Sequence, residues 1–207
     1  MSNLKILVLY YSSTGTNYKM ANWAAEAVRQ RGALCRIAKA AELVPQEYID
    51  ENPAWRRNHE NTTHIPVAKL DDLEWAHGLI ISTPTRYGNV PAQLKQFLDS
   101  TGSLWREGKL KDKTVTAMSS AMNPHGGQEQ TILSIYTTMF HWGAIVVSPG
   151  YTHPSFYEAG GNPYGTSVSV DENGHMNEDI KDAVLFQALR LVDITERIRH
   201  SREVVHS

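Results

Sequence analysis

The stretch LYYSSTGTNYKMA, Leu9 to Ala21, joins the end of an apolar run to the start of a helical pattern. Between the two lie four hydroxyl side chains and a single glycine, Gly15. A helix N-terminus offers unpaired backbone N–H groups and the positive end of the helix dipole. Hydroxyl donors around a glycine at this position indicate a phosphate-binding loop. The alternative is an ordinary helix cap made by a serine or threonine.

The same loop excludes two common classes of nucleotide site. It matches neither GxxxxGK[ST], the pattern of nucleoside triphosphatases, nor GxGxxG, the pattern of dinucleotide-binding folds. It also holds no lysine or arginine, because Lys19 already lies inside the predicted helix. We therefore expect a single terminal phosphate, held by hydrogen bonds alone.

Apolar runs elsewhere predict the rest of a sheet. Near-continuous apolar runs are typical of parallel strands that are buried on both faces. The predicted strands are residues 4–11, 33–38, 77–83, 113–120 and 143–150. Helical patterns occupy residues 17–31, 70–76, 90–101, 127–142 and 178–200. This alternation predicts an α/β, doubly wound parallel sheet in the order 2-1-3-4-5, with helices on both faces and a ligand site outside the carboxyl ends of strands one and three.

Two stretches exceed a minimal fold of this kind. Residues 42–69 are polar, and we expect an excursion with about one helical turn. Residues 150–177 are rich in glycine, proline and aromatic residues, and residues 165–170 within them predict a strand that extends the fifth one. Neither stretch resembles a linker, so we expect a single domain over residues 1–207.

Composition limits the possible partners and locations. The net charge is −2 with no basic stripe, which speaks against nucleic acid as a partner. No apolar run is long enough to span a bilayer, and we expect no signal peptide. The single cysteine, Cys35, excludes an internal disulfide and favours the cytoplasm. The nine histidines show no ligand-like spacing, so no metal site is predicted.

Two more strand ends break into loops of small and polar residues. STPTRYGNVPAQLKQFLD (82–99) follows the third strand, and SSAMNPHGGQEQT (119–131) follows the fourth. In the first loop, we expect Thr85, Arg86 and Tyr87 to face the same crevice as residues 12–17, which we call the hydroxyl loop. A flat ligand would fit along the backbone of the first loop. Three such loops at one edge of the sheet are hard to explain by folding alone, and they indicate a binding site.

Together these segments resemble the flavodoxin-like NAD(P)H:quinone oxidoreductases of the tryptophan-repressor-binding-protein (WrbA) family. The resemblance covers nearly the whole chain. Its carriers are VLYYSSTGTNYKMA, TPTRYGNVPAQLKQFLDSTGSLW, GGQEQT, FHWG and NPYGTS. It implies a flavodoxin-like three-layer sandwich, FMN as cofactor, NAD(P)H and a quinone as substrates, and a homotetramer built from two dimers.

The resemblance also implies roles for individual residues. The FMN phosphate would be held by Ser12, Ser13, Thr14, Gly15, Thr16 and Asn17. The ribityl chain and the flavin ring would be lined by Pro84, Thr85, Arg86, Tyr87 and Gly88. The polar edge of the ring would be bounded by Ser119, Ser120, Ala121, Met122, Asn123, His125 and Gly126. His141 would lie in the flavin pocket and Trp105 at the quinone-binding face, and His141 or Tyr87 would supply or orient a proton for the quinone oxygen.

The implied reaction is two-electron transfer by a ping-pong mechanism, in which oxidised nicotinamide leaves before the quinone binds. The main alternative is a one-electron flavodoxin that docks to redox partners, although such carriers are shorter and more acidic. A non-catalytic FMN-binding protein and a reductase of azo compounds or iron chelates are also compatible with these residues.

Overall fold

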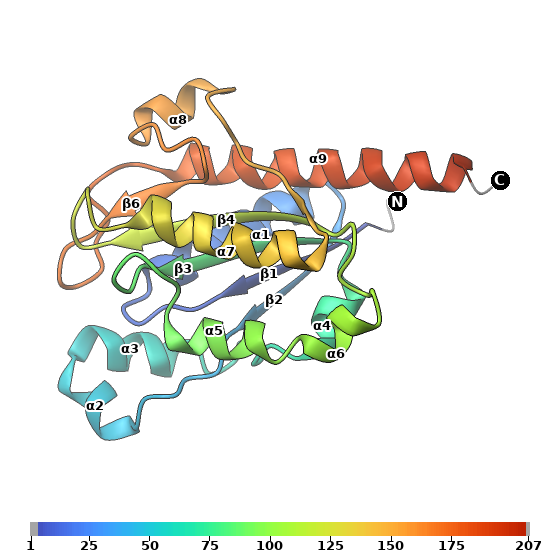
Figure 1. Ribbon diagram of the computed structural model, residues 1–207. Coiled ribbons are helices and arrows are strands. Elements are labelled where there is room, and N and C mark those ends of the chain that lie inside the picture. Colours follow the sequence, from blue (N-terminus) through green and yellow to red (C-terminus); the bar gives the residue numbers. More distant parts are fainter. Residues whose placement is uncertain (1–3, 206–207) are drawn as a thin grey trace.

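Parallel strands form the centre of this computed structural model, which describes residues 4–205 (Figure 1). The strands are β1 Lys5–Tyr10, β2 Leu34–Lys39, β3 Gly78–Pro84, β4 Thr114–Ala121, β5 Ile145–Val146 and β6 Ser167–Ser169. Their order is β2-β1-β3-β4-β5, and β6 also pairs with β4. Each of these pairings is parallel. The predicted flavodoxin-like order is thus confirmed.

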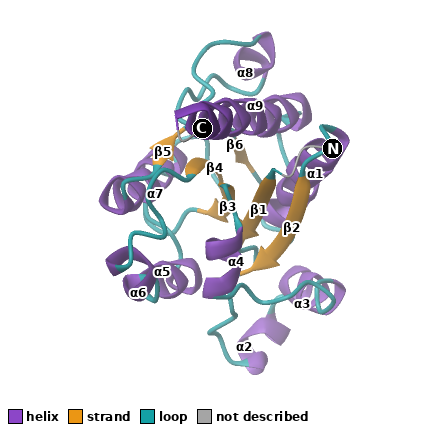
Figure 2. Ribbon diagram, turned by 90° about the vertical axis from the view of Figure 1, so that its right-hand side faces the viewer, coloured by secondary structure: helices purple, strands orange, loops and turns teal. Residues whose placement is uncertain are grey.

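Helices cover both faces of the sheet (Figure 2). They are α1 Thr16–Gln30, α2 Gln46–Glu51, α3 Pro53–Asn61, α4 Leu70–Trp75, α5 Ala92–Asp99, α6 Gly102–Arg106, α7 Gln128–Trp142, α8 Pro154–Glu158 and α9 Lys181–Val205. α1 and α9 pack on one face, and α4, α5, α6 and α7 pack on the other. None of the helices within residues 4–205 combines the length and the apolar character that a membrane crossing requires.

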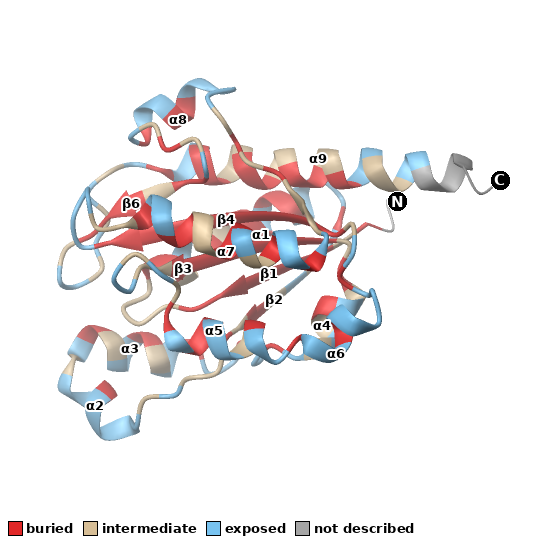
Figure 3. Ribbon diagram, in the orientation of Figure 1, coloured by how far each residue is buried: buried red, intermediate tan, exposed pale blue. Residues whose placement is uncertain are grey.

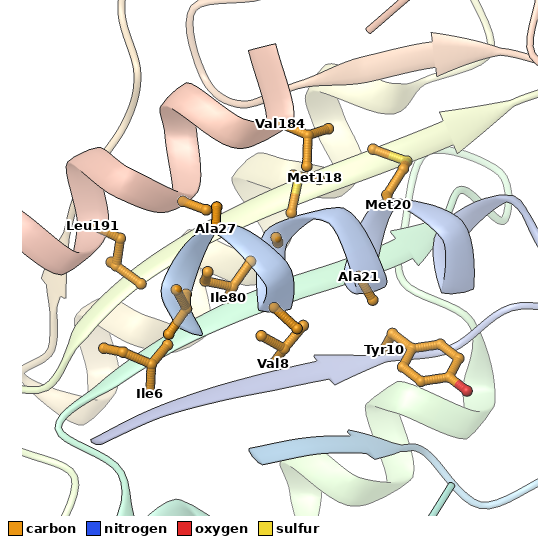
Figure 4. Packing of buried hydrophobic residues seen from close by; sticks show 14 of the residues in the cluster. Ile6, Val8, Tyr10, Met20, Ala21, Ala27, Ile80, Met118, Val184 and Leu191 are labelled. Carbon is orange, nitrogen blue, oxygen red and sulfur yellow. The ribbon is translucent and has the colours of Figure 1, made fainter. Parts of the chain in front are cut away.

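Alternate residues of each strand enter different halves of the core. In β1, Ile6 and Val8 contact the layer formed by α1 and α9, and Leu7 and Leu9 contact the opposite layer. Figure 4 shows Ile6 and Val8 beneath α1, with Leu191 of α9 beside them. β1, β3 and β4 are red along most of their length in Figure 3, because both of their faces are covered, whereas the edge strand β2 is largely exposed or half-buried. This two-sided burial explains why the strand sequences read as continuous apolar runs.

The fifth strand is shorter than the predicted 143–150. β5 pairs only with Thr114 and Val115, at the amino end of β4. The chain then leaves the sheet: Arg190 donates to the Ser148 carbonyl at 3.0 Å, and Pro149 has no N–H to donate. β6 pairs with the carboxyl end of β4 instead. The expectation that residues 165–170 extend the fifth strand therefore agrees with the structure.

The 42–69 insertion contains two helices, α2 and α3, rather than one turn. The Asn52 side chain begins α3 by accepting from the N–H groups of Ala54 and Trp55, at 3.0 and 3.1 Å. α3 then reaches the hydroxyl loop. Asn58 Nδ2 donates to the carbonyls of Ser12 and Ser13, at 2.8 and 3.0 Å. The insertion thus supports the loop that joins β1 to α1.

His77, which directly precedes β3, is hydrogen-bonded to the first residue of β1 at the amino end of the sheet. Nδ1 of His77 accepts from the Lys5 N–H at 3.0 Å. Burial, together with the positive charges of Arg199, Lys5 and Lys113, lowers the pKa of His77 from 6.5 to about 4. The folded protein therefore holds this imidazole neutral at neutral pH.

Because the pKa of His77 is lower in the folded state, the unfolded chain binds more protons between pH 4 and pH 6.5. The stabilisation from the neutral ring is complete above pH 6.5 and disappears as the pH falls to 4. We expect His77→Gln, which keeps an acceptor for Lys5, to flatten this part of the pH profile. Urea unfolding at pH 7 and pH 4.5 measures it, and an equal loss of stability in variant and wild type would contradict the assignment.

Candidate functional site

A cleft of about 330 Å³ opens at the carboxyl ends of the strands. The loops that follow β1, β3, β4 and β6 gather there, at the left of the sheet in Figure 1. The lining residues are Ser13, Thr14, Thr16, Asn17, Pro84, Thr85, Arg86, Tyr87, Ser120, Ala121, Met122, Asn123, Gly126, Val170, Asp171 and Glu172. The three segments that the sequence indicated as a site therefore surround one cavity.

The hydroxyl loop forms the start of α1. Gly15 is the N-cap residue and has φ 103°, a conformation that favours glycine. Ser12 Oγ accepts from the Gly15 N–H at 3.0 Å, so this hydroxyl shapes the loop and does not line the cleft. The first turn of α1 carries no acidic side chain. Its unpaired N–H groups and positive dipole end are available to an anion.

Asn17 joins this loop to two other strands. The residue is 1% exposed. Its Nδ2 donates to Ser120 Oγ at 2.7 Å, and its Oδ1 accepts from Ser82 Oγ at 3.2 Å. With its side-chain amide used on both sides, Asn17 holds the ends of β1, β3 and β4 in a fixed relation.

Arg86 brings a positive charge to the hydroxyl loop. Its Nη2 donates to Ser13 Oγ at 3.0 Å. The expectation of a phosphate site without a cation is therefore wrong, because the cation comes from the loop after β3. Behind Ser13, the Tyr11 hydroxyl donates to the Glu42 carboxylate at 3.0 Å, and burial raises the pKa of Tyr11. Gln93 also donates to Glu42, at 2.7 Å.

Tyr87 stands at the mouth of the cleft on a tight turn. The Arg86 N–H donates to the Asn89 carbonyl at 2.8 Å, and the Asn89 N–H donates back to Arg86 at 3.0 Å. The two residues between them both have positive φ, 54° for Tyr87 and 76° for Gly88. This conformation is uncommon for a bulky residue and is often found at functional sites. The Tyr87 side chain is fully exposed.

The loop after β4 packs backbone to backbone against this turn. A Cβ at Gly127 would lie 2.8 Å from Gly88 Cα, so only glycine allows the approach. Gly88 thus supports the cleft from behind and does not line it. Ser119 is fully buried, with its hydroxyl unpaired among the described residues, and His125 is exposed outside the cleft.

Two predicted residues lie at the opposite end of the molecule. α7 begins beside the cleft and ends near the amino end of β4, where the Asp112 N–H donates to the Gly143 carbonyl at 2.9 Å. His141 is in the last turn of α7, and Trp105 Nε1 in α6 donates to its carbonyl at 2.9 Å. Figure 1 shows α6 and this end of α7 on the right, away from the cleft. The roles that the resemblance gives them stay predictions.

The segment after β6 also lines the cleft, through Val170, Asp171 and Glu172, which were not predicted as site residues from the sequence. An Asn-Gly pair in DENGH, residues 171–175, was the available signal, because this pair is typical of a tight turn. Hydrogen bonds from the backbone N–H and the ring of His175 lower the pKa of Asp171. In the part of the chain that the structure describes, no three metal-binding side chains are grouped.

Comparisons with solved structures find the same fold in other proteins. A flavodoxin described as WrbA-like, from Agrobacterium tumefaciens, has a similar fold, with a TM-score of 0.64 and 18% identity over 94% of this chain and 98% of that one. An archaeal flavodoxin gives a TM-score of 0.61 at 14% identity, over 93% of this chain and 99% of that one.

Two curated relatives are more similar in sequence. The NAD(P)H dehydrogenase (quinone) of Deinococcus radiodurans is 43% identical over 94% of this chain and 97% of its own length. The NAD(P)H dehydrogenase (quinone) 3 of Rhizobium meliloti is 34% identical over 96% and 95%. The model of the NADPH-dependent FMN reductase family matches residues 4–158. The chain therefore belongs to the NADPH-dependent FMN reductase family.

Proposed function

We propose that this protein is an FMN-dependent oxidoreductase that transfers two electrons from NAD(P)H to quinones by a ping-pong mechanism. One observation carries the proposal: a single cleft combines an anion-binding helix N-terminus with an open slot between two backbone loops. The relatives named NAD(P)H dehydrogenase (quinone) match almost the whole chain, which supports the same activity here.

The residues of the cleft fit FMN. A terminal phosphate suits the N–H groups at the start of α1 and the hydroxyls of Ser13 and Thr14, with Arg86 as the countercharge. The flat ring suits the slot between Pro84–Tyr87 and Ala121–Asn123. FMN, when bound, supplies the chemistry of accepting a hydride from nicotinamide and returning two electrons to a quinone.

The residues of the protein would bind FMN, orient it, and leave the mouth of the cleft open to the substrates. Backbone N–H groups of the loop after β4 would stabilise negative charge on the ring edge near Ser120. Tyr87 and Met122 are exposed at the mouth, where a nicotinamide and a quinone would bind in turn. Tyr87, or His141 reaching this cleft from another subunit, would orient a proton toward the quinone oxygen, and solvent also reaches this open site.

We also propose membership of the WrbA branch and a homotetramer of two dimers. Trp105 and His141 are hydrogen-bonded neighbours far from the cleft of their own subunit. The roles implied for them, quinone binding and a place in the flavin pocket, therefore require that they reach the cleft of another subunit. The exposed side chains of Trp105 and Phe140 support a contact surface there. The single cysteine supports a cytoplasmic location.

The first test is spectroscopic. Protein purified with excess FMN should bleach near 450 nm when NADPH is added anaerobically, and 1,4-benzoquinone should restore the absorbance in full. Initial rates at several quinone concentrations should give parallel double-reciprocal lines. A failure of NADPH to bleach bound FMN would favour the one-electron carrier, and intersecting lines would contradict the ping-pong scheme.

Thr14→Val tests the phosphate end of the cleft. Loss of one hydrogen bond to a charged phosphate should weaken FMN binding about 10- to 100-fold, because such bonds contribute roughly 1.5–3 kcal/mol. Thr137→Val, at an exposed position on α7, is the matched control and should leave FMN affinity unchanged. Equal affinities for both variants would move the phosphate to another part of the cleft.

Sedimentation and subunit mixing test the tetramer. The expected mass is four times 23.2 kDa, and Trp105→Ala and Thr14→Val should each lower quinone reduction. If Trp105 serves a neighbouring cleft, dissociated and reassembled mixtures of the two impaired variants should be more active than either variant alone, since some clefts then receive both intact parts. A 23.2 kDa species with full activity would refute the arrangement.

A further inference from the structure

A short segment between β6 and α9, residues 171–177, closes over the hydroxyl loop from outside the sheet. We call it the strap. It is anchored at both ends: the Val170 N–H donates to the Ala121 carbonyl at 2.8 Å, and the Asn177 N–H donates to the Ser169 carbonyl at 3.0 Å. Asn177 Nδ2 also donates to Ser169 Oγ at 3.0 Å. The strap is therefore fixed to the end of β4 and β6.

The turn of the strap is held by its own side chains. The Asp171 carboxylate accepts from the N–H groups of Asn173 and His175, at 2.9 and 2.8 Å. His175 Nδ1 lies 2.9 Å from the second carboxylate oxygen. The Gly174 N–H donates to the Asp171 carbonyl at 3.0 Å. These bonds use the Asp171 carboxylate within the turn and place Gly174 at its tip.

Gly174 touches the hydroxyl loop directly. Its carbonyl accepts from Thr16 Oγ1 at 2.8 Å, a bond between residues 158 positions apart. A Cβ at Gly174 would lie 2.4 Å from Thr14 Oγ1 and 2.9 Å from Thr14 Cβ, and φ is +82°. The fit between the strap and Thr14 therefore depends on the absence of a side chain at position 174.

The bond to Gly174 also decides what Thr16 can do. A threonine hydroxyl has one hydrogen to donate, and an ionised phosphate only accepts. While Thr16 donates to Gly174, it has no hydrogen for a phosphate. The donors left at this end of the cleft are the N–H groups of α1, the Arg86 guanidinium and the Thr14 hydroxyl. The Ser13 hydroxyl joins them when it turns away from the Tyr11 oxygen, to which it donates at 3.4 Å.

We propose that the strap positions the phosphate-binding loop, and that Thr16 is a positioning residue bonded to Gly174 rather than a ligand of the phosphate. This inference rests on the proposed FMN site. At its tip, Gly174, the strap contacts Thr14 and Thr16. On the ring side it is joined to Ala121 through the Val170 N–H, a backbone bond at the other end of the turn, which a change at Gly174 does not remove. Loss of the contact at the tip should therefore affect the phosphate part of flavin binding and spare the ring part.

Two flavins separate these parts, because riboflavin has the ring and the ribityl chain of FMN without the phosphate. Apoprotein is titrated with each flavin, and quenching of flavin fluorescence gives both dissociation constants. In Gly174→Ala we expect FMN binding to weaken about tenfold or more, the effect of about one hydrogen bond to a charged group, and riboflavin binding to stay unchanged. Gly32→Ala is the control, since Gly32 has φ +87° with nothing within 4 Å of an added Cβ.

A double-mutant cycle tests the role of Thr16. Thr16→Val should weaken FMN binding in the wild type but add little in Gly174→Ala, because the clash of the added Cβ with Thr14 displaces the carbonyl to which Thr16 donates. Thr16→Ser keeps the hydroxyl and should bind FMN normally. An undiminished effect of Thr16→Val in the Gly174→Ala background would make Thr16 a phosphate ligand and overturn the proposal.

The titrations also distinguish failure of the strap from failure of the flavin site. An unchanged FMN affinity in Gly174→Ala, or equal weakening of FMN and riboflavin, would overturn the role of the strap while leaving the FMN site intact. If the wild type binds neither flavin, the proposed function fails and the inference fails with it.

Discussion

The buried amide of Asn17 is the interaction on which the rest of the site depends. One side chain, 1% exposed, is hydrogen-bonded to Ser82 of β3 and to Ser120 of β4 while its backbone begins α1. A buried amide is costly unless its polar atoms are paired, so only one relative placement of these three strand ends satisfies it. The cleft therefore has a defined shape because a polar group inside the protein must be paired.

Much of the sheet could be predicted from sequence, because parallel strands buried on both faces must be apolar along their length. The order around β1 and β3 followed from this pattern and the handedness of crossovers. The fifth strand could not be placed in full. Residues 143–150 are as apolar as a strand, but β5 ends at Val146 and β6 takes the position beside the far half of β4. The composition of a segment does not indicate which of the two, β5 or β6, pairs with a given part of β4.

The loops of the cleft were also predictable, because three strand ends with small and hydroxyl residues had to meet at one edge. The cation at the hydroxyl loop was not, since Arg86 lies 73 residues from Ser13 along the chain. Asn58, whose bonds support the loop from α3, and the segment at residues 170–172 were missed for the same reason. Each of these residues acts through a contact with a distant part of the chain, and the hydrophobic pattern of the sequence does not indicate such contacts.

The contact between Gly88 and Gly127 has a consequence for how this family can diversify. With no side chain between the two glycines, the turn at Tyr87 and the loop at Met122 pack backbone to backbone. The side chains of Tyr87 and Met122, at the tips of these loops, project into solvent. Substitutions at these tips change the side chains that contact an electron acceptor, without disturbing the backbone packing between the two loops. Acceptor preference can thus drift among descendants of one scaffold, whereas a side chain at Gly127 would meet the Gly88 backbone, separate the two loops and distort the cleft.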